Sequence, residues 1–162
     1  MDEETHARAV AVLDAFRARG WTLATAESCT GGLVAGALTE VPGSSDVVDR
    51  GFVTYSNAAK VAMIGVPEAT LAAHGAVSVE TARAMAEGAL KAAGVDAAVA
   101  ITGVAGPGGG SEAKPVGLVH FACARRDATI VTREKRFGDV GRAEVRRLSV
   151  LEALDLLRDA AA

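Results

Sequence analysis

The stretch that decides the fold is Trp21-Thr-Leu-Ala-Thr-Ala-Glu-Ser-Cys-Thr-Gly-Gly-Leu-Val-Ala-Gly-Ala-Leu38. Its composition predicts a short strand over residues 21–26, a polar turn over residues 27–30 and a helix over residues 31–38. A strand that passes directly into a helix is the repeating unit of α/β folds. This stretch therefore predicts a sheet that is covered by helices.

The same alternation of elements continues on both sides of this stretch. Residues 5–19 place apolar side chains at helical spacing, and Gly20 is a typical helix stop. Further helices are predicted at 57–64, 68–73, 79–93 and 142–158, and strands at 47–55, 97–102, 116–124 and 129–137. The last two strands form a predicted hairpin, so the sheet contains an antiparallel pair. We therefore expect an α/β fold, a three-layer α/β/α sandwich with a mixed β-sheet, in one domain over residues 1–162.

Charge and composition exclude several classes of function. The net charge is −3, and the densest basic cluster, Arg142, Arg146 and Arg147, lies among acidic residues. Nucleic acid is therefore not an expected partner. The apolar runs are short and the first residues are acidic, which predicts neither a membrane span nor a secretory signal. Two cysteines are too few for a disulfide framework, so a reducing, cytoplasmic location is expected.

The turn at residues 27–30 holds the first candidate for chemistry. Main-chain N–H groups at the start of a helix point toward such a turn, and a Ser28 hydroxyl beside them could act as a nucleophile. Local sequence alone favours a simpler interpretation, in which Ser28 or Thr30 caps the helix. Cys29 is a competing nucleophile, although a single cysteine near a helix start is more often packed than reactive.

Tyr55 and Lys60 form the second candidate. Tyr55 ends a predicted strand, and Lys60 lies near the start of the next predicted helix. The helix dipole disfavours a cation there and lowers the proton affinity of the amine, which suits a general base for a serine. The simpler interpretation is a solvated surface lysine.

The third candidate is the glycine-rich loop at residues 103–111, directly after a buried strand. Clustered glycines allow main-chain N–H groups to converge on an anion, although a flexible surface loop is the alternative. The loop has neither an ATP nor a dinucleotide fingerprint. His6, His74 and His120 lack the neighbours of a catalytic triad, and no cluster has metal-ligand spacing. We therefore expect no metal and no cofactor.

Together these segments resemble one family. Thr25-Ala-Glu-Ser-Cys-Thr-Gly-Gly-Leu33, Gly51-Phe-Val-Thr-Tyr-Ser-Asn-Ala-Ala-Lys60 and Thr102-Gly-Val-Ala-Gly-Pro-Gly-Gly-Gly110, followed by Lys114-Pro-Val-Gly117, are similar to motifs of the CinA C-terminal domain, the nicotinamide-nucleotide amidase family. The three motifs occur in the family's order over nearly the whole chain. Many relatives carry a further N-terminal domain, and this chain resembles the stand-alone form.

The resemblance implies hydrolysis of nicotinamide mononucleotide to nicotinate mononucleotide and ammonia, in pyridine-nucleotide recycling. Ser28 would attack the amide carbon, and Lys60, with Tyr55 as relay or orienter, would move the proton. Main-chain N–H groups near Thr30 and Gly31 would form the oxyanion hole. The residues that the resemblance places around the substrate are Thr30, Gly31, Gly32, Thr102, Gly103, Gly106, Gly108 and Arg142.

The chain departs from the family pattern before the last helix. Relatives often have Gly-Asp-Arg there, whereas this chain reads Gly138-Asp-Val-Gly-Arg142 and leaves Arg142 as the nearest equivalent for a phosphate contact. The family leads us to expect a homo-oligomer, namely a dimer. Two alternatives stay open: a non-catalytic nucleotide-binding or interaction domain linked to competence and DNA damage, and an amidase for another carboxamide.

Overall fold

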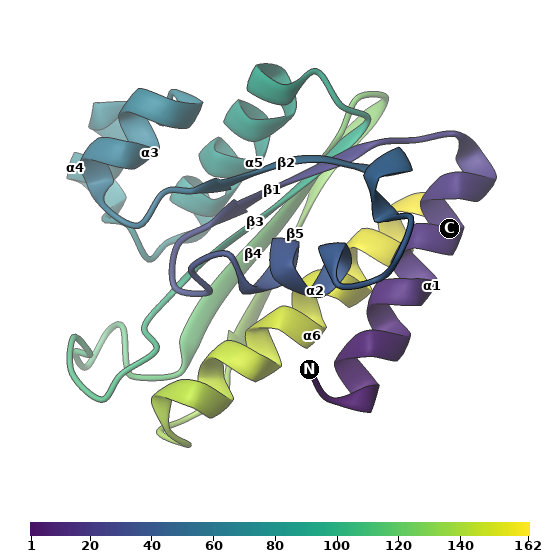
Figure 1. Cartoon of the computed structure of the whole chain (residues 1–162). Helices are drawn as coiled ribbons and strands as arrows, with labels where there is room; N and C mark the ends of the chain where they lie inside the picture. The colour runs from purple at the N-terminus through teal and green to yellow at the C-terminus, as the bar shows by residue number, and fades with distance from the viewer.

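The computed structural model describes all residues, 1–162, as a three-layer α/β/α sandwich, as predicted (Figure 1). The strands are β1 Leu23–Glu27, β2 Val48–Val53, β3 Ala97–Gly103, β4 Leu118–Arg125 and β5 Ala128–Arg136. The helices are α1 Glu3–Arg19, α2 Leu33–Thr39, α3 Asn57–Ile64, α4 Glu68–His74, α5 Val79–Ala93 and α6 Arg142–Ala161, with a short 3₁₀ turn, η1 Ser44–Asp46. None of the helices is both long enough and apolar enough to cross a bilayer.

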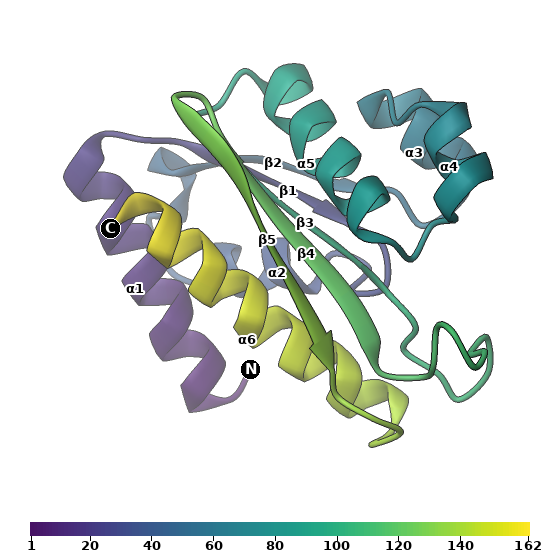
Figure 2. The same ribbon diagram turned by 180° about the vertical axis from the view of Figure 1, so that it is seen from behind.

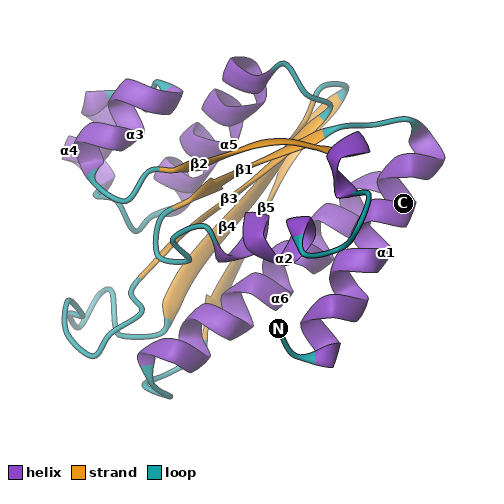
Figure 3. Cartoon of the chain, in the orientation of Figure 1, coloured by secondary structure: helices purple, strands orange, loops and turns teal.

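The sheet is mixed, with the strand order β2-β1-β3-β4-β5. Strands β2, β1 and β3 run parallel, so their carboxyl ends lie at one edge of the sheet. Strand β4 runs antiparallel to β3 and forms the predicted hairpin with β5. Three polar or glycine-rich segments thereby leave the sheet side by side, after β1, β2 and β3 (Figure 3).

Each face of the sheet has its own core, because side chains alternate along each strand. One face carries larger side chains, such as Leu23, Ile101 and Phe121, and packs against α1, α2 and α6. The opposite face is built from alanines and is covered by α5, with α3 and α4 beyond it (Figure 2). The alanines are Ala24, Ala26, Ala98, Ala100, Ala122 and Ala124. Their small side chains let α5 approach the sheet closely.

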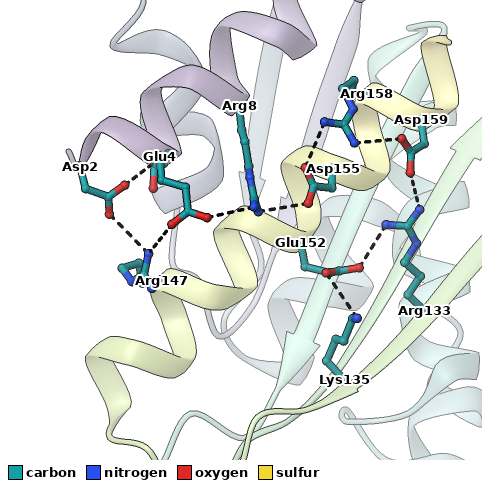
Figure 4. Close-up of polar contacts among 11 residues, drawn as sticks. Asp2, Glu4, Arg8, Arg133, Lys135, Arg147, Glu152, Asp155, Arg158 and Asp159 are labelled. Carbon is teal, nitrogen blue, oxygen red and sulfur yellow. Dashed lines mark hydrogen bonds and ion pairs between the residues drawn. The ribbon is translucent and has the colours of Figure 1, made fainter.

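Charged side chains tie α6 to its neighbours on the molecular surface (Figure 4). Arg8 on α1 lies 3.1 Å from Asp155 on α6, and Arg133 on β5 lies 3.1 Å from Glu152 on α6. Exposed ion pairs contribute little stability individually. As a network they hold the position of α6, whose first turns reach the carboxyl edge of the parallel strands.

Candidate active site

A cavity of about 190 Å³ lies at the carboxyl edge of the parallel strands. In open α/β sheets this edge is where ligands bind. The cavity collects segments from all three candidate motifs and from the start of α6. Its walls are Ser28, Cys29, Tyr55, Lys60, Ala76, Val77, Thr102, Gly103, Ala105 and Arg142.

Ser28 and Lys60 meet in this cavity. Ser28 directly follows β1, and Lys60 lies on α3, a helix capped by the Ser56 hydroxyl, which accepts from the main-chain N–H of Ala59 at 3.0 Å. Lys60 Nζ lies 3.1 Å from Ser28 Oγ. It also contacts the carbonyl oxygens of Thr54 at 2.9 Å and Tyr55 at 3.4 Å.

The surroundings of Lys60 favour its neutral form. The side chain is buried, with 1% exposure, and no carboxylate lies within ion-pair distance of its amine. Burial lowers the pKa of the Lys60 amine from its ordinary value of 10.5. A neutral amine can donate to the two carbonyl oxygens and still present its lone pair to the Ser28 hydroxyl. The geometry suits a serine that is activated by a neighbouring amine.

The other candidate nucleophile, Cys29, is unsuited to this chemistry. Its thiol is buried in the larger hydrophobic core. Burial raises the pKa of the Cys29 thiol to about 12, so it is protonated at neutral pH. Of the two candidate nucleophiles in the turn, this leaves the Ser28 hydroxyl, which contacts the Lys60 amine.

The turn that carries Ser28 is anchored by Glu27, and the predicted cap of α2 was wrong. Neither Ser28 nor Thr30 caps this helix. The buried Glu27 carboxylate accepts from the main-chain N–H groups of Val34 at 2.9 Å and Ala35 at 3.0 Å. The helix also begins at Leu33 rather than residue 31, because Gly31 and Gly32 adopt φ values of 57° and 100°, outside the right-handed helical region.

The main-chain donors of the turn differ in their availability. The N–H group of Gly31 donates to the Ser28 carbonyl oxygen at 3.0 Å, so it is occupied within the turn, contrary to the role expected for it. The N–H groups of Cys29 and Thr30 have no acceptor in the chain, and of these two residues only Cys29 lines the cavity beside Ser28. The Cys29 N–H group is therefore a free donor available to a negative charge that develops beside Ser28.

Comparisons with known proteins identify the family of the chain. Residues 5–161 match the model of the CinA C-terminal domain family. The chain belongs to this family. Over 144 residues the CinA domain is 57% identical to "Nicotinamide-nucleotide amidohydrolase PncC" of Escherichia coli (strain K12), covering 88% of this chain and 86% of that protein. A PncC protein of Enterobacter agglomerans is 50% identical over 84% of this chain and 83% of its own length.

Solved structures share the fold of the CinA domain throughout. The crystal structure of the competence/damage inducible protein CihA from Agrobacterium tumefaciens has a TM-score of 0.96 and 52% sequence identity, with 99% of this chain and 97% of that chain covered. Some curated relatives are longer. The chain spans 35% of the length of a "CinA-like protein" from Synechococcus sp. (strain RCC307), at 55% identity.

Tyr55 lies at the same cavity of the CinA domain but does not contact Lys60 through its side chain. Its ring is exposed, and its hydroxyl accepts from Arg142 at 3.0 Å. Only the main-chain carbonyl oxygen of Tyr55 reaches Lys60. Arg142 also donates to the carbonyl oxygen of Gly106 at 2.8 Å, which joins the rim to the glycine-rich loop.

Of the remaining residues predicted to contact the substrate, some line the cavity and others do not. Thr102 and Gly103 line the cavity, although the Thr102 hydroxyl donates to the Ala76 carbonyl oxygen at 2.8 Å. Thr30 is fully buried, and none of the predicted glycines Gly31, Gly32, Gly106 and Gly108 is part of the cavity wall. The cavity therefore gathers Ser28, Tyr55, Lys60, Thr102, Gly103 and Arg142 from the predicted set.

Arg146 was noted in the sequence only as part of a basic cluster and not as a site residue. It lies one turn beyond Arg142 on α6 and donates to the carbonyl oxygens of Cys29 at 3.2 Å and Thr30 at 3.4 Å. Arg146 and Glu27 thus hold the Ser28 turn from two sides, one through carbonyl oxygens and the other through N–H groups. The one available signal was the position of Arg146 one helical turn after Arg142, which places both side chains toward one face.

Proposed function

We propose that this chain is an amidase that hydrolyses nicotinamide mononucleotide to nicotinate mononucleotide and ammonia through an acyl-enzyme on Ser28. The observation that carries the reaction type is the 3.1 Å contact between Ser28 Oγ and the buried, carboxylate-free Lys60 amine. The PncC names of relatives at 50% and 57% identity support the substrate.

The first half of the reaction forms the acyl-enzyme. The neutral Lys60 amine takes the proton of the Ser28 hydroxyl as Oγ bonds to the carboxamide carbon. The carbonyl oxygens of Thr54 and Tyr55 then hold the resulting ammonium group. Lys60 returns the proton to the departing nitrogen, which leaves as ammonia, and the carbonyl oxygen is stabilised during this step by the N–H group of Cys29.

The second half releases the acid product. Water attacks the ester on Ser28, and Lys60 takes a proton from that water and returns it to Ser28 Oγ. The products are nicotinate mononucleotide and free enzyme. Acid–base transfer by one positioned group in both halves is typical of serine acyl transfer.

The dimensions of the cavity suit one end of such a substrate. Pockets that enclose whole drug-sized ligands are roughly 300 to 1,000 Å³, whereas this cavity is about 190 Å³. The pyridine carboxamide would enter it, and the ribose and phosphate would lie at the rim. There Arg142 and the main chain of the glycine-rich loop, with Gly103 and Gly106, offer donors and a positive charge.

The experiment that tests this assignment is a measurement of ammonia release with chelator present. Nicotinamide mononucleotide would be compared with nicotinamide riboside and with free nicotinamide. We expect ammonia from the mononucleotide, and a sharp loss of kcat/KM when the phosphate is removed. Folded protein that binds the mononucleotide without releasing ammonia would instead favour a nucleotide-binding domain. Faster release from a substrate without the phosphate would indicate another carboxamide.

A further inference from the structure

The segment of residues 75–78, between α4 and α5, is anchored through its carbonyl oxygens. Thr81 Oγ1 and Ser78 Oγ donate to the carbonyl oxygen of Gly75 at 2.7 and 3.0 Å. Thr102 Oγ1, at the end of β3, donates to the carbonyl oxygen of Ala76 at 2.8 Å. We call residues 75–78 the donor strap.

A further anchor precedes the donor strap. Lys114 Nζ, from the segment after the glycine-rich loop, donates to the carbonyl oxygen of His74 at 2.6 Å. Three consecutive carbonyl oxygens, from the last residue of α4 through Ala76, are therefore fixed by side chains from α5, β3 and the loop before β4. The main chain here is oriented by several independent contacts.

The Gly75 N–H group donates to the Leu71 carbonyl oxygen at 2.9 Å, whereas other N–H groups of the donor strap are left without partners. In a planar trans peptide the N–H group points opposite to the carbonyl oxygen of the preceding residue. The N–H groups of Ala76 and Val77 therefore point away from the hydroxyls that hold Gly75 and Ala76, and neither has an acceptor in the chain. Both residues line the cavity that contains Ser28 Oγ and Lys60 Nζ.

We propose that the main-chain N–H groups of Ala76 and Val77 bind the carboxamide oxygen of the substrate, and that Thr102 is a positioning residue that orients the Val77 N–H group. This rests on the proposed amidase function. As Ser28 Oγ bonds to the carboxamide carbon, the C=O π pair moves onto oxygen, and the oxyanion accepts from these two donors. The pair re-forms C=O when the C–N bond breaks and nitrogen takes its proton from Lys60.

The donor strap complements the single donor of the Ser28 turn. Oxyanion holes of acyl-transfer enzymes commonly combine the N–H group after the nucleophile with one from a separate loop. Here the N–H group of Cys29 would supply the first part and the donor strap the second. Thr102 then acts on catalysis through Ala76, rather than by touching the ribose or phosphate.

The test compares Thr102→Val, which removes the hydroxyl, with Thr102→Ser, which keeps it. We expect kcat for ammonia release to fall about ten- to hundredfold in Thr102→Val, less than the roughly 10²- to 10³-fold loss on removing one oxyanion donor outright. KM and the pH midpoint of kcat, which Lys60 sets, should change little. Thr102→Ser should retain most of the activity, whereas a purely structural role would change KM and the pH profile as well.

A second pair of variants tests the Val77 donor directly. Val77→Pro removes the N–H group, and Val77→Ala shortens the side chain but keeps that donor. We expect Val77→Pro to lose more activity than Thr102→Val, and also more than Val77→Ala, which keeps the N–H donor. If the wild type is active and both Thr102→Val and folded Val77→Pro keep the wild-type kcat, the oxyanion-binding role of the donor strap is wrong, while the amidase assignment stands. A wild type that releases no ammonia would overturn the amidase assignment itself.

Discussion

The Glu27 carboxylate is expected to hold the Ser28 turn in place, and replacing it should reduce both stability and activity. Its two oxygens accept from the N–H groups of Val34 and Ala35, and the Thr25 hydroxyl adds a third contact at 3.2 Å. Glu27→Gln keeps one carbonyl oxygen but turns an amide N–H₂ toward one of these donors. One N–H group at the start of α2 then loses its acceptor.

The size of the effect follows from the number of donors left unpaired. A buried donor without an acceptor costs about 1–3 kcal/mol, so Glu27→Gln should destabilise the fold by about 2 kcal/mol. For chains of this length 1 kcal/mol lowers Tm by about 2–4 °C, which predicts a fall of roughly 4–8 °C. Glu27→Ala leaves two N–H groups unpaired and should cost about 3–5 kcal/mol.

Thermal melts followed by circular dichroism, together with ammonia release at a temperature where both proteins are folded, would measure the effect. Glu40→Gln is the matched control, because Glu40 lies exposed at the other end of α2 and makes no ion pair. We expect Glu40→Gln to match wild type in Tm and kcat. A Glu27→Gln protein with wild-type Tm and kcat would refute the anchoring role of Glu27.

Three further predictions concern the base, the α6 arginine and the rim. Because burial lowers the pKa of Lys60 and the base must be neutral, kcat/KM should rise with pH to a midpoint below 10.5. The same shift makes the free energy of unfolding rise with pH between the folded-state pKa of Lys60 and 10.5. Urea titrations of Lys60→Met should show no such rise. Arg146→Met should lower kcat about tenfold, since the carbonyl oxygens of Cys29 and Thr30 lose their shared donor. The control Arg158→Met, on the exposed end of α6, should keep the wild-type kcat, and equal kcat in the two variants would contradict the prediction. Tyr55→Phe loses only the exposed contact with Arg142, so steady-state kinetics should show a raised KM and a kcat within about threefold of wild type. A kcat loss as large as that of Lys60→Met would instead support a role for Tyr55 as a proton relay.

Local patterns in the sequence predicted the elements well. The apolar spacing of residues 5–19 and the stop at Gly20 correspond to α1, with Gly20 in the left-handed conformation. The helices predicted at 57–64 and 79–93 are observed with these bounds, capped by Ser56 and Ser78. The boundary of α2 was missed because a Gly-Gly pair is compatible with both a helix start and a left-handed turn, and only the packing of Glu27 selects the turn.

The site was predictable only in part, because its contacts cross long sequence separations. The motifs brought Ser28 and Lys60 forward as candidates, but their 3.1 Å contact depends on β1 and β2 ending at the same edge. Glu27 was read as part of a turn, and nothing local indicates that its carboxylate folds back onto α2. Arg146 reaches Cys29 from α6 at the other end of the chain, a contact that no local pattern predicts.

The most direct test of the Ser28–Lys60 pair is the rate of ammonia release from nicotinamide mononucleotide by wild type, Ser28→Ala and Lys60→Met at one neutral pH, with chelator present and cooperative melting confirmed for each protein. We expect release by wild type and a loss in each variant of at least about 10²-fold, the lower end of the contribution of a positioned acid–base group. Release by folded Ser28→Ala or Lys60→Met at the wild-type rate would contradict the pairing of nucleophile and base on which the mechanism depends.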